Sequence, residues 1–160
     1  MVILGIDPGL TKTGFGILSI YNNKLNLIDY GIIEPNKEDS LSLRLYTIFT
    51  DIEELINTYS PTIISIEEIF YGVNVKSALL LGQARGAAMI CSAKYNIPVF
   101  EYSAKKVKQA LTGNGNADKT QIQYMVKQIF NLKVLPEPLD ASDAIGIALC
   151  HYNQLKIKEI

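Results

Sequence analysis

The sequence predicts an α/β protein in which a five-stranded mixed sheet, made of a three-strand antiparallel meander and two parallel strands, carries helices on both faces. Two observations lead to this fold class. Apolar runs of strand length open the chain and recur between longer stretches whose apolar residues follow the period of an α-helix. The order is three strands, then helix, strand, helix and strand, and then helices alone, which is typical of a mixed sheet between two helical layers.

The first three predicted strands follow one another with only short turns between them. Residues 2–7 form an apolar run that ends at a Pro-Gly pair, and residues 14–20 alternate apolar and small side chains. A polar turn at residues 21–24 leads into a third run at residues 25–33. Because strands joined by short turns pair antiparallel, we expect a meander.

Helices and two further strands alternate through the rest of the chain. Residues 41–59 carry apolar side chains at helical spacing, and Ser40 precedes them as an N-cap. The remaining elements that we expect are a strand at 62–67, a loop at 69–75, a helix at 76–95, a strand at 99–101, and helices at 103–111, 117–130 and 141–155. Crossover connections are right-handed in nearly all proteins, so the first, fourth and fifth strands should be parallel neighbours.

Length and composition indicate a single domain spanning residues 1–160. The hydrophobic share of 48% and the charged share of 19% are those of an ordinary globular protein. The sequence shows neither a signal peptide nor an apolar run of transmembrane length, so we expect a cytoplasmic protein. His151 is the only histidine, and Cys91 and Cys150 lack C-x-x-C spacing, which argues against a zinc cluster and a Ser-His-Asp triad.

Lysines gather in the second half of the chain. The net charge of -1 gives no general support for nucleic-acid binding. Residues 102–133, however, contain six lysines and one aspartate, a local charge of +5 that leaves -6 for the rest of the chain. Such a cluster is either a solvated face or a surface that contacts phosphate.

Four acids occur where strands end or where the last helix begins. Asp7 and Glu67 end the first and fourth strands, and Asp140 and Asp143 are one helical turn apart. Ligands of such sheets bind beyond the carboxyl ends of the parallel strands, so we expect the four carboxylates to converge there. Helix capping and compensation of the helix dipole are the alternative explanation for the aspartate pair.

Carboxylates that converge without histidine or thiolate indicate a site for a hard cation. Mg²⁺ is expected, and Mn²⁺ can substitute. Two such ions about 4 Å apart suit in-line attack of water on a phosphodiester. We therefore expect a metal-dependent nuclease. A wide gap between Asp7 and the aspartate pair, or a lysine or arginine among the acids, would end the case for this site.

Six short motifs occur in a characteristic order along the chain. They are Ile6-Asp7-Pro8-Gly9, Ile66-Glu67-Glu68-Ile69-Phe70, Gly82-Gln83-Ala84-Arg85-Gly86, Glu101-Tyr102, Val107-Lys108-Gln109 and Asp140-Ala141-Ser142-Asp143-Ala144. In this order they resemble the bacterial RuvC Holliday-junction resolvases, nearly from end to end. The resemblance implies an RNase H-like fold and a homodimer that cuts opposing strands of four-way junction DNA with Mg²⁺, leaving 5′-phosphate and 3′-hydroxyl ends. It also implies a branch-migration motor of the RuvA and RuvB type as a partner.

The resemblance also implies roles for individual residues. The family's metal-binding acids, expected to hold two Mg²⁺ per site, are matched by Asp7, Glu67, Asp140 and Asp143. Lys108 and Lys119 match basic residues that contact the phosphate backbone near the cut. Phe70 matches an aromatic that contacts bases at the junction centre, with closure of the core edge as the alternative. Arg85 is assigned to DNA binding, and anchoring of a loop or of a partner would explain it equally well.

One face of the second long helix carries small residues, and the sequence leaves two explanations for them. Ala78, Gly82, Gly86 and Ala93 permit close approach of a neighbour. This neighbour is either the protein's own sheet or a second protomer. The overall acidity, with a pI of about 5.8, departs from what is usual in a DNA-cutting enzyme.

Three other functions fit parts of the sequence. Residues 7–14 also resemble the first phosphate loop of actin-like ATPases and sugar kinases, but such enzymes need two lobes and 160 residues supply one. The second is a nuclease of the same fold that acts on RNA or on other branched DNA. The third is a junction-binding protein without catalysis, against which the four acids argue.

Overall fold

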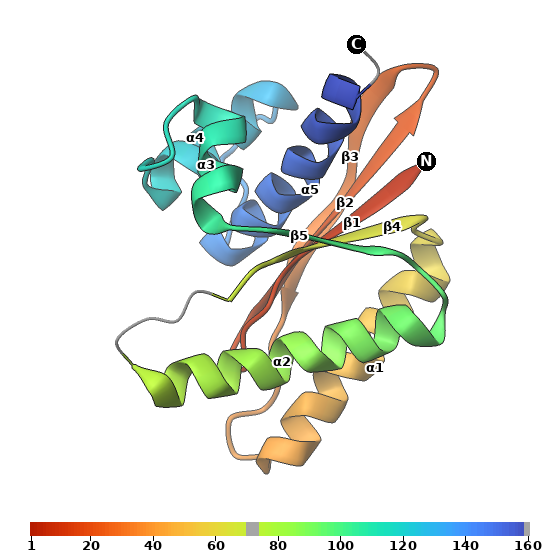
Figure 1. The fold of residues 1–160 in the computed structure, drawn as a ribbon, viewed down its shortest axis with the longest axis vertical. Helices are drawn as coiled ribbons and strands as arrows, with labels where there is room; N and C mark the ends of the chain where they lie inside the picture. The colour runs from red at the N-terminus through yellow and green to blue at the C-terminus, as the bar shows by residue number, and fades with distance from the viewer. Residues whose placement is uncertain (70–73, 159–160) are drawn as a thin grey trace.

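A five-stranded mixed sheet organises the chain, as the sequence predicts. The computed structural model describes residues 1–69 and 74–158. The strands are β1 (Val2–Asp7), β2 (Thr13–Tyr21), β3 (Lys24–Ile33), β4 (Ile63–Glu67) and β5 (Val99–Tyr102). Their order across the sheet is β3-β2-β1-β4-β5 (Figure 1). The meander β1–β2–β3 is antiparallel, while β4 pairs in parallel with both β1 and β5, which confirms the predicted topology.

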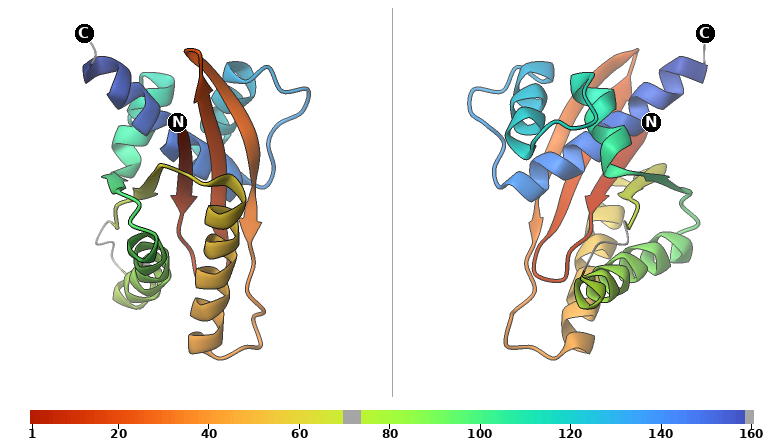
Figure 2. Two further views of the ribbon diagram at one scale, coloured as in Figure 1. Left: turned by 90° about the vertical axis from the view of Figure 1, so that its right-hand side faces the viewer. Right: turned by 60° about the vertical axis from the view of Figure 1, so that its left-hand side comes forward.

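Helices cover both faces of this sheet (Figures 1 and 2). One face carries α1 (Leu41–Tyr59) and α2 (Val75–Lys94), and the other carries α3 (Ala104–Thr112), α4 (Lys119–Ile129) and α5 (Leu139–Lys158). The last helix begins before Asp140 rather than after it, so both aspartates lie inside the helix. The N-terminus of α4 lies at Lys119 because Asp118 and Gln121 form a capping box there. No helix among the described residues is long and apolar enough to cross a membrane.

The alternation of side chains along β1 decides which way its acid points. Ile3 packs into the core beneath α3, α4 and α5, while Leu4 and Ile6 pack into the core beneath α1 and α2. Because successive residues of a strand face opposite sides, Asp7 faces the same side as Ile3. The same rule applies to β4, where Ile64 and Ile66 belong to the α1–α2 core. Glu67 therefore faces the α5 side together with Asp7.

Three glycines in β1 and β2 allow α5 to lie close against the sheet. A Cβ atom at Gly5 would overlap the backbone of Ala144, and one at Gly14 would overlap the carbonyl oxygen of Asp140. A Cβ atom at Gly16 would lie 2.9 Å from the Cα of Ile145. The first turns of α5 can therefore approach the backbone of the sheet, which places the aspartates of α5 beside the carboxyl end of β1.

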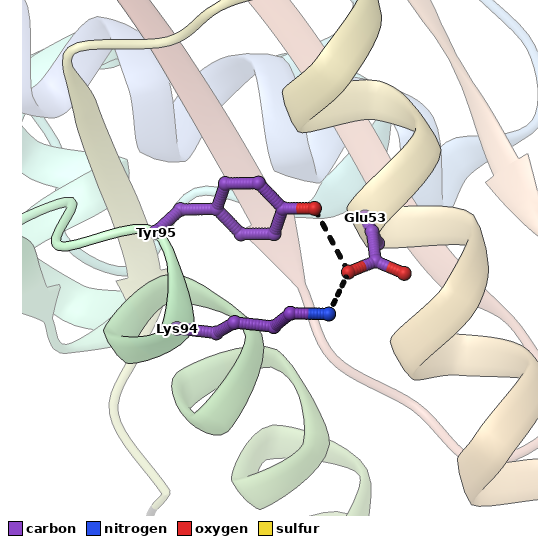
Figure 3. A network of polar contacts seen from close by, with 3 residues as sticks. All are labelled: Glu53, Lys94 and Tyr95. Carbon is purple, nitrogen blue, oxygen red and sulfur yellow. Dashed lines mark hydrogen bonds and ion pairs between the residues drawn. The ribbon is translucent and has the colours of Figure 1, made fainter.

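A polar network ties the two helices on the opposite face to each other (Figure 3). The Lys94 ammonium lies 2.6 Å from Oε1 of Glu53 on α1, and the hydroxyl of Tyr95 donates to the same oxygen at 2.9 Å. Lys94 and Tyr95 both lie at the C-terminal end of α2. This network fixes the end of α2 that is remote from Asn74, the N-cap of that helix.

Candidate active site

Asp7 and Glu67 end two neighbouring parallel strands at the same edge of the sheet. The register pairs Ile6 with Ile66, so the two acids occupy equivalent next positions, where burial and the charge of Glu67 raise the pKa of Asp7. The turn that follows Asp7 is closed by the buried Thr13. Its hydroxyl accepts from the backbone N–H of Gly9 at 3.2 Å and donates to the carbonyl of Gly9 at 2.8 Å.

The aspartates of α5 meet Asp7 at this edge. One carboxylate oxygen from each of Asp7, Asp140 and Asp143 lies within 4.8 Å of the others. The fourth acid, Glu67, ends the strand next to that of Asp7, and its charge adds to burial in raising the pKa of Asp7. The structure thus brings together the four acids that the sequence analysis selected. A set of carboxylate oxygens at this spacing fits a hard divalent cation such as Mg²⁺ or Mn²⁺.

The charges of these acids disfavour one another. Burial, followed by repulsion from Glu67 and Asp143, raises the pKa of Asp7 well above its ordinary value. Burial is also the largest cause that raises the pKa of Glu67 and that of Asp143. Asp7, Glu67 and Asp143 are therefore less stable as anions here than in water, and a bound cation would relieve both the burial cost and the repulsion.

A lysine lies among the acids. The expectation that no lysine or arginine would lie there was wrong. Lys119 places its ammonium 2.5 Å from Oδ2 of Asp143 and 3.7 Å from Oδ1 of Asp140. The sequence had offered only Asp118 as a partner for this lysine. The Asp118 side chain instead accepts from the backbone of α4 as its N-cap, so the lysine is left to pair with α5.

This ion pair does not neutralise the site. The Lys119 side chain is 55% exposed, and its single ammonium stands against a group of four carboxyl groups whose burial and mutual repulsion raise the pKa of Asp7. Burial alone would lower the pKa of Lys119, but the hydrogen bond to Asp143 and the attraction of the surrounding acids together outweigh it, and the pKa is raised. The ammonium is therefore a partial counter-ion on a solvated side chain, and the surplus of negative charge still favours a divalent cation.

A small cavity extends from the acids toward the lysine-rich helices. It has a volume of about 150 Å³, and its polar lining comes from Glu67, Asp143, Lys119 and Lys108. A larger cleft of about 610 Å³ adjoins Asp7 and Glu67 and reaches Lys105 at the start of α3. In the smaller cavity, the carboxylates of Glu67 and Asp143 thus lie beside Lys108 and Lys119. This arrangement can hold a cation and a phosphate group together.

Comparison with known proteins agrees with this geometry. The model of the family described as crossover junction endodeoxyribonuclease RuvC matches residues 3–151. The chain belongs to the RuvC family. The RuvC of Alkaliphilus oremlandii is 45% identical over 151 residues, which cover 94% of this chain and 92% of that protein. The RuvC of Petrotoga mobilis is 46% identical over 153 residues, covering 96% and 94% of the two chains.

Solved structures of the RuvC family have the same fold. Thermus thermophilus RuvC in complex with Holliday junction substrate superposes with a TM-score of 0.91 at 31% identity, covering 99% of this chain and 96% of that one. A second Thermus thermophilus RuvC structure gives a TM-score of 0.89 at 30% identity, covering 99% and 97% of the two chains. These matches confirm the RNase H-like fold that the sequence predicts.

Two other residues selected from the RuvC motifs have different outcomes. Phe70 lies outside the described residues, so its assignment to bases at a junction centre stays a prediction. The guanidinium of Arg85 pairs with the carboxylate of Glu101 on β5, and the Arg85 side chain is only 17% exposed. Arg85 thus connects α2 to the strand next to Glu67. Its predicted contact with DNA remains a prediction.

Proposed function

We propose that this RuvC-family protein resolves four-way (Holliday) DNA junctions in homologous recombination and DNA repair. The reaction is metal-dependent hydrolysis of one phosphodiester in each of two opposing strands, and it leaves 5′-phosphate and 3′-hydroxyl ends. The observation that carries the proposal is the convergence of Asp7, Asp140 and Asp143 within 4.8 Å beside a lysine-lined hollow. The structural similarity to a RuvC bound to its junction substrate supports the choice of DNA.

The four acids would hold the metal. Asp7, Asp140 and Asp143 offer one oxygen each to a common position, and Glu67 adds a carboxylate on the β4 side. We propose two Mg²⁺ ions per site, with Mn²⁺ as a substitute, because all the donors are oxygen atoms. When bound, such ions supply activation of water and stabilisation of charge on the leaving 3′ oxygen. The buried walls of the site keep these carboxylates fixed while the substrate binds.

The lysines and the aromatic position the DNA in this proposal. Lys108 and Lys119 line the same hollow as Glu67 and Asp143, so a phosphate placed against the acids lies within reach of both ammonium groups. Lys119 would then exchange its contact with Asp143 for a contact with phosphate. Phe70 would contact bases at the junction centre, where stacking on an unpaired base contributes about 1–3 kcal/mol.

Paired cleavage requires two active sites, and we propose a homodimer. The small-residue face of α2 is not the face that packs on the sheet, which is formed by Ala84, Ala88 and Cys91. A Cβ atom at Gly86 would meet nothing within 4 Å. Around Gly86 this face is open to a second protomer, whereas a Cβ atom at Gly82 would lie 3.5 Å from the Ile69 side chain of the same chain. We also propose that a branch-migration motor of the RuvA and RuvB type is a partner of this protein. The proposed location is the cytoplasm, where the DNA substrate is found.

Incubation of the pure protein with a labelled four-way junction tests this function. We expect symmetric nicks in two opposing strands with Mg²⁺ or Mn²⁺ and none in EDTA. Asp7→Asn should abolish cutting while junction binding persists. Binding without cleavage by the wild type would indicate a junction-binding protein instead. Cleavage of RNA hybrids alone would indicate a different nuclease of the same fold.

A further inference from the structure

The carbonyl oxygen of Pro136 accepts two hydrogen bonds from buried side chains on different helices. The Nε2 amide of Gln123 on α4 donates to it at 2.9 Å, and the hydroxyl of Ser142 on α5 donates to it at 2.7 Å. Gln123 is 7% exposed, Ser142 is 0% exposed, and Pro136 is buried. A carbonyl has two lone pairs, so both donors can be satisfied by this one acceptor.

Both donors adjoin the proposed metal site in sequence. Ser142 lies between Asp140 and Asp143 on the first turns of α5. Gln123 lies one helical turn after Lys119 on α4, so the two residues share a side of that helix. The segment that carries Pro136 is also tied to α5 by the backbone N–H of Ala141, which donates to the carbonyl of Pro138 at 3.0 Å. The Pro136 carbonyl therefore joins the helix that carries the lysine to the helix that carries the aspartates.

We infer that Gln123 and Ser142 are positioning residues, which hold Lys119 and the Asp140–Asp143 pair at a fixed separation through the Pro136 carbonyl. This inference rests on the proposed metal-dependent function. Neither residue contacts the acids through its side chain, so each would act only through geometry. When both donors are removed, a buried carbonyl remains without a partner, and the connection must shift to reach water. The first turn of α5 would shift with it, and the carboxylate oxygens would lose their common position.

Four variants test this role. Ser142→Ala removes the hydroxyl, and Gln123→Met removes the amide donor at nearly constant volume. The double variant removes both donors. The matched control is Ser92→Ala, since Ser92 is also 0% exposed and its hydroxyl donates to the carbonyl of Ala88 at 2.8 Å, but on α2. The readouts are the affinity for Mn²⁺ without DNA by calorimetry, the Mg²⁺ concentration that half-saturates cleavage, and the melting temperature.

We expect each single variant to weaken Mn²⁺ binding about threefold, and the double variant about thirtyfold, which lies within the range of about 10- to 100-fold known for residues behind metal ligands. The double effect should exceed the product of the single effects, because one remaining donor still satisfies the carbonyl. Saturating Mg²⁺ should restore most of the cleavage rate. The Ser92→Ala variant should bind Mn²⁺ like the wild type, even where its melting temperature falls.

The outcomes separate this inference from the proposed function. Folded Ser142→Ala and Gln123→Met variants that bind Mn²⁺ as tightly as the wild type would overturn the inference. If the double variant does not fold, these two single variants decide. A wild type that binds no Mn²⁺ and cuts without a divalent cation would instead overturn the proposed metal dependence.

Discussion

The Lys119 ammonium lies 2.5 Å from Oδ2 of Asp143, so a side chain proposed to contact DNA is paired with an acid proposed to bind metal. The two roles use the same Asp143 oxygens, since a divalent cation and the ammonium cannot both approach them closely. The lysine is well exposed and begins α4, so it can turn toward a phosphate when the acids are occupied. The bound cation would then replace the ammonium as the positive charge beside Asp143, and the ammonium would offset the negative charge of the phosphate.

Lys119→Met should separate these two roles. Without the competing ammonium, the affinity for Mn²⁺ in the absence of DNA should rise about two- to fivefold, the range of an exposed ion pair. Cleavage at saturating metal should nevertheless fall about ten- to a hundredfold, because a cation beside the reacting phosphate is lost. Calorimetry and single-turnover cleavage measure the two effects. Unchanged cleavage would show that Lys119 serves only as a counter-ion to the acids.

The raised pKa of Asp7 makes the stability of the metal-free protein depend on pH. A carboxyl group whose pKa is higher in the folded state than its ordinary 3.8 contributes stability below that value and loses it as pH rises through the folded-state pKa. Asp7→Asn removes this contribution. In EDTA, the wild type should therefore become less stable relative to Asp7→Asn as the pH rises from about 4 to about 7. Urea unfolding across this range measures the difference.

Two comparisons make the pH experiment specific. Glu38→Gln removes the charge of an exposed acid between β3 and α1, and it is the control for loss of one acidic side chain. Addition of Mg²⁺ at neutral pH should stabilise the wild type more than Asp7→Asn, since the bound cation relieves the repulsion. A wild type that gains stability over Asp7→Asn as the pH rises in EDTA would contradict the assigned cause.

Gly14→Ala should displace the aspartates of α5. Its Cβ atom would overlap the carbonyl oxygen of Asp140, so α5 must move away from β2. Overpacking of this kind typically destabilises a protein by about 1–3 kcal/mol, and the shift should also weaken Mn²⁺ binding. Thermal unfolding and calorimetry test both effects. The control for Mn²⁺ binding is Gly86→Ala in α2, where the added methyl group would meet nothing within 4 Å in the same chain and the affinity for Mn²⁺ should be unchanged.

Arg85→Gln and Glu101→Gln should have matching effects. The Arg85 guanidinium is already paired with Glu101, so we expect each variant to slow cleavage by loosening the link between α2 and β5. Neither variant should change the slope of junction affinity against salt concentration. Lys108→Ala is the comparison, since loss of a phosphate contact should lower that slope by about one. A smaller slope for Arg85→Gln alone would show that Arg85 contacts DNA.

The strands and the direction of two acids were predictable because they follow from short-range patterns. A strand alternates its side chains with a period of two, so the apolar residues of β1 and β4 determine that Asp7 and Glu67 project from the same face. Parallel neighbours end at the same edge, which brings the two acids together once the strand order is known. The meeting of Asp7 and Glu67 therefore followed from patterns within single elements and one topological rule.

The partners of individual side chains were not predictable in this way. Lys119 pairs with Asp143, which is 24 positions away, and Gln123 and Ser142 meet at the carbonyl of Pro136. These contacts depend on the angle and depth at which α4 and α5 pack, and the glycines of β1 and β2 set that depth. Local periodicity indicates which face of an element is buried. The separation between two faces depends on all the side chains packed between them, and it is defined only when the whole core has assembled.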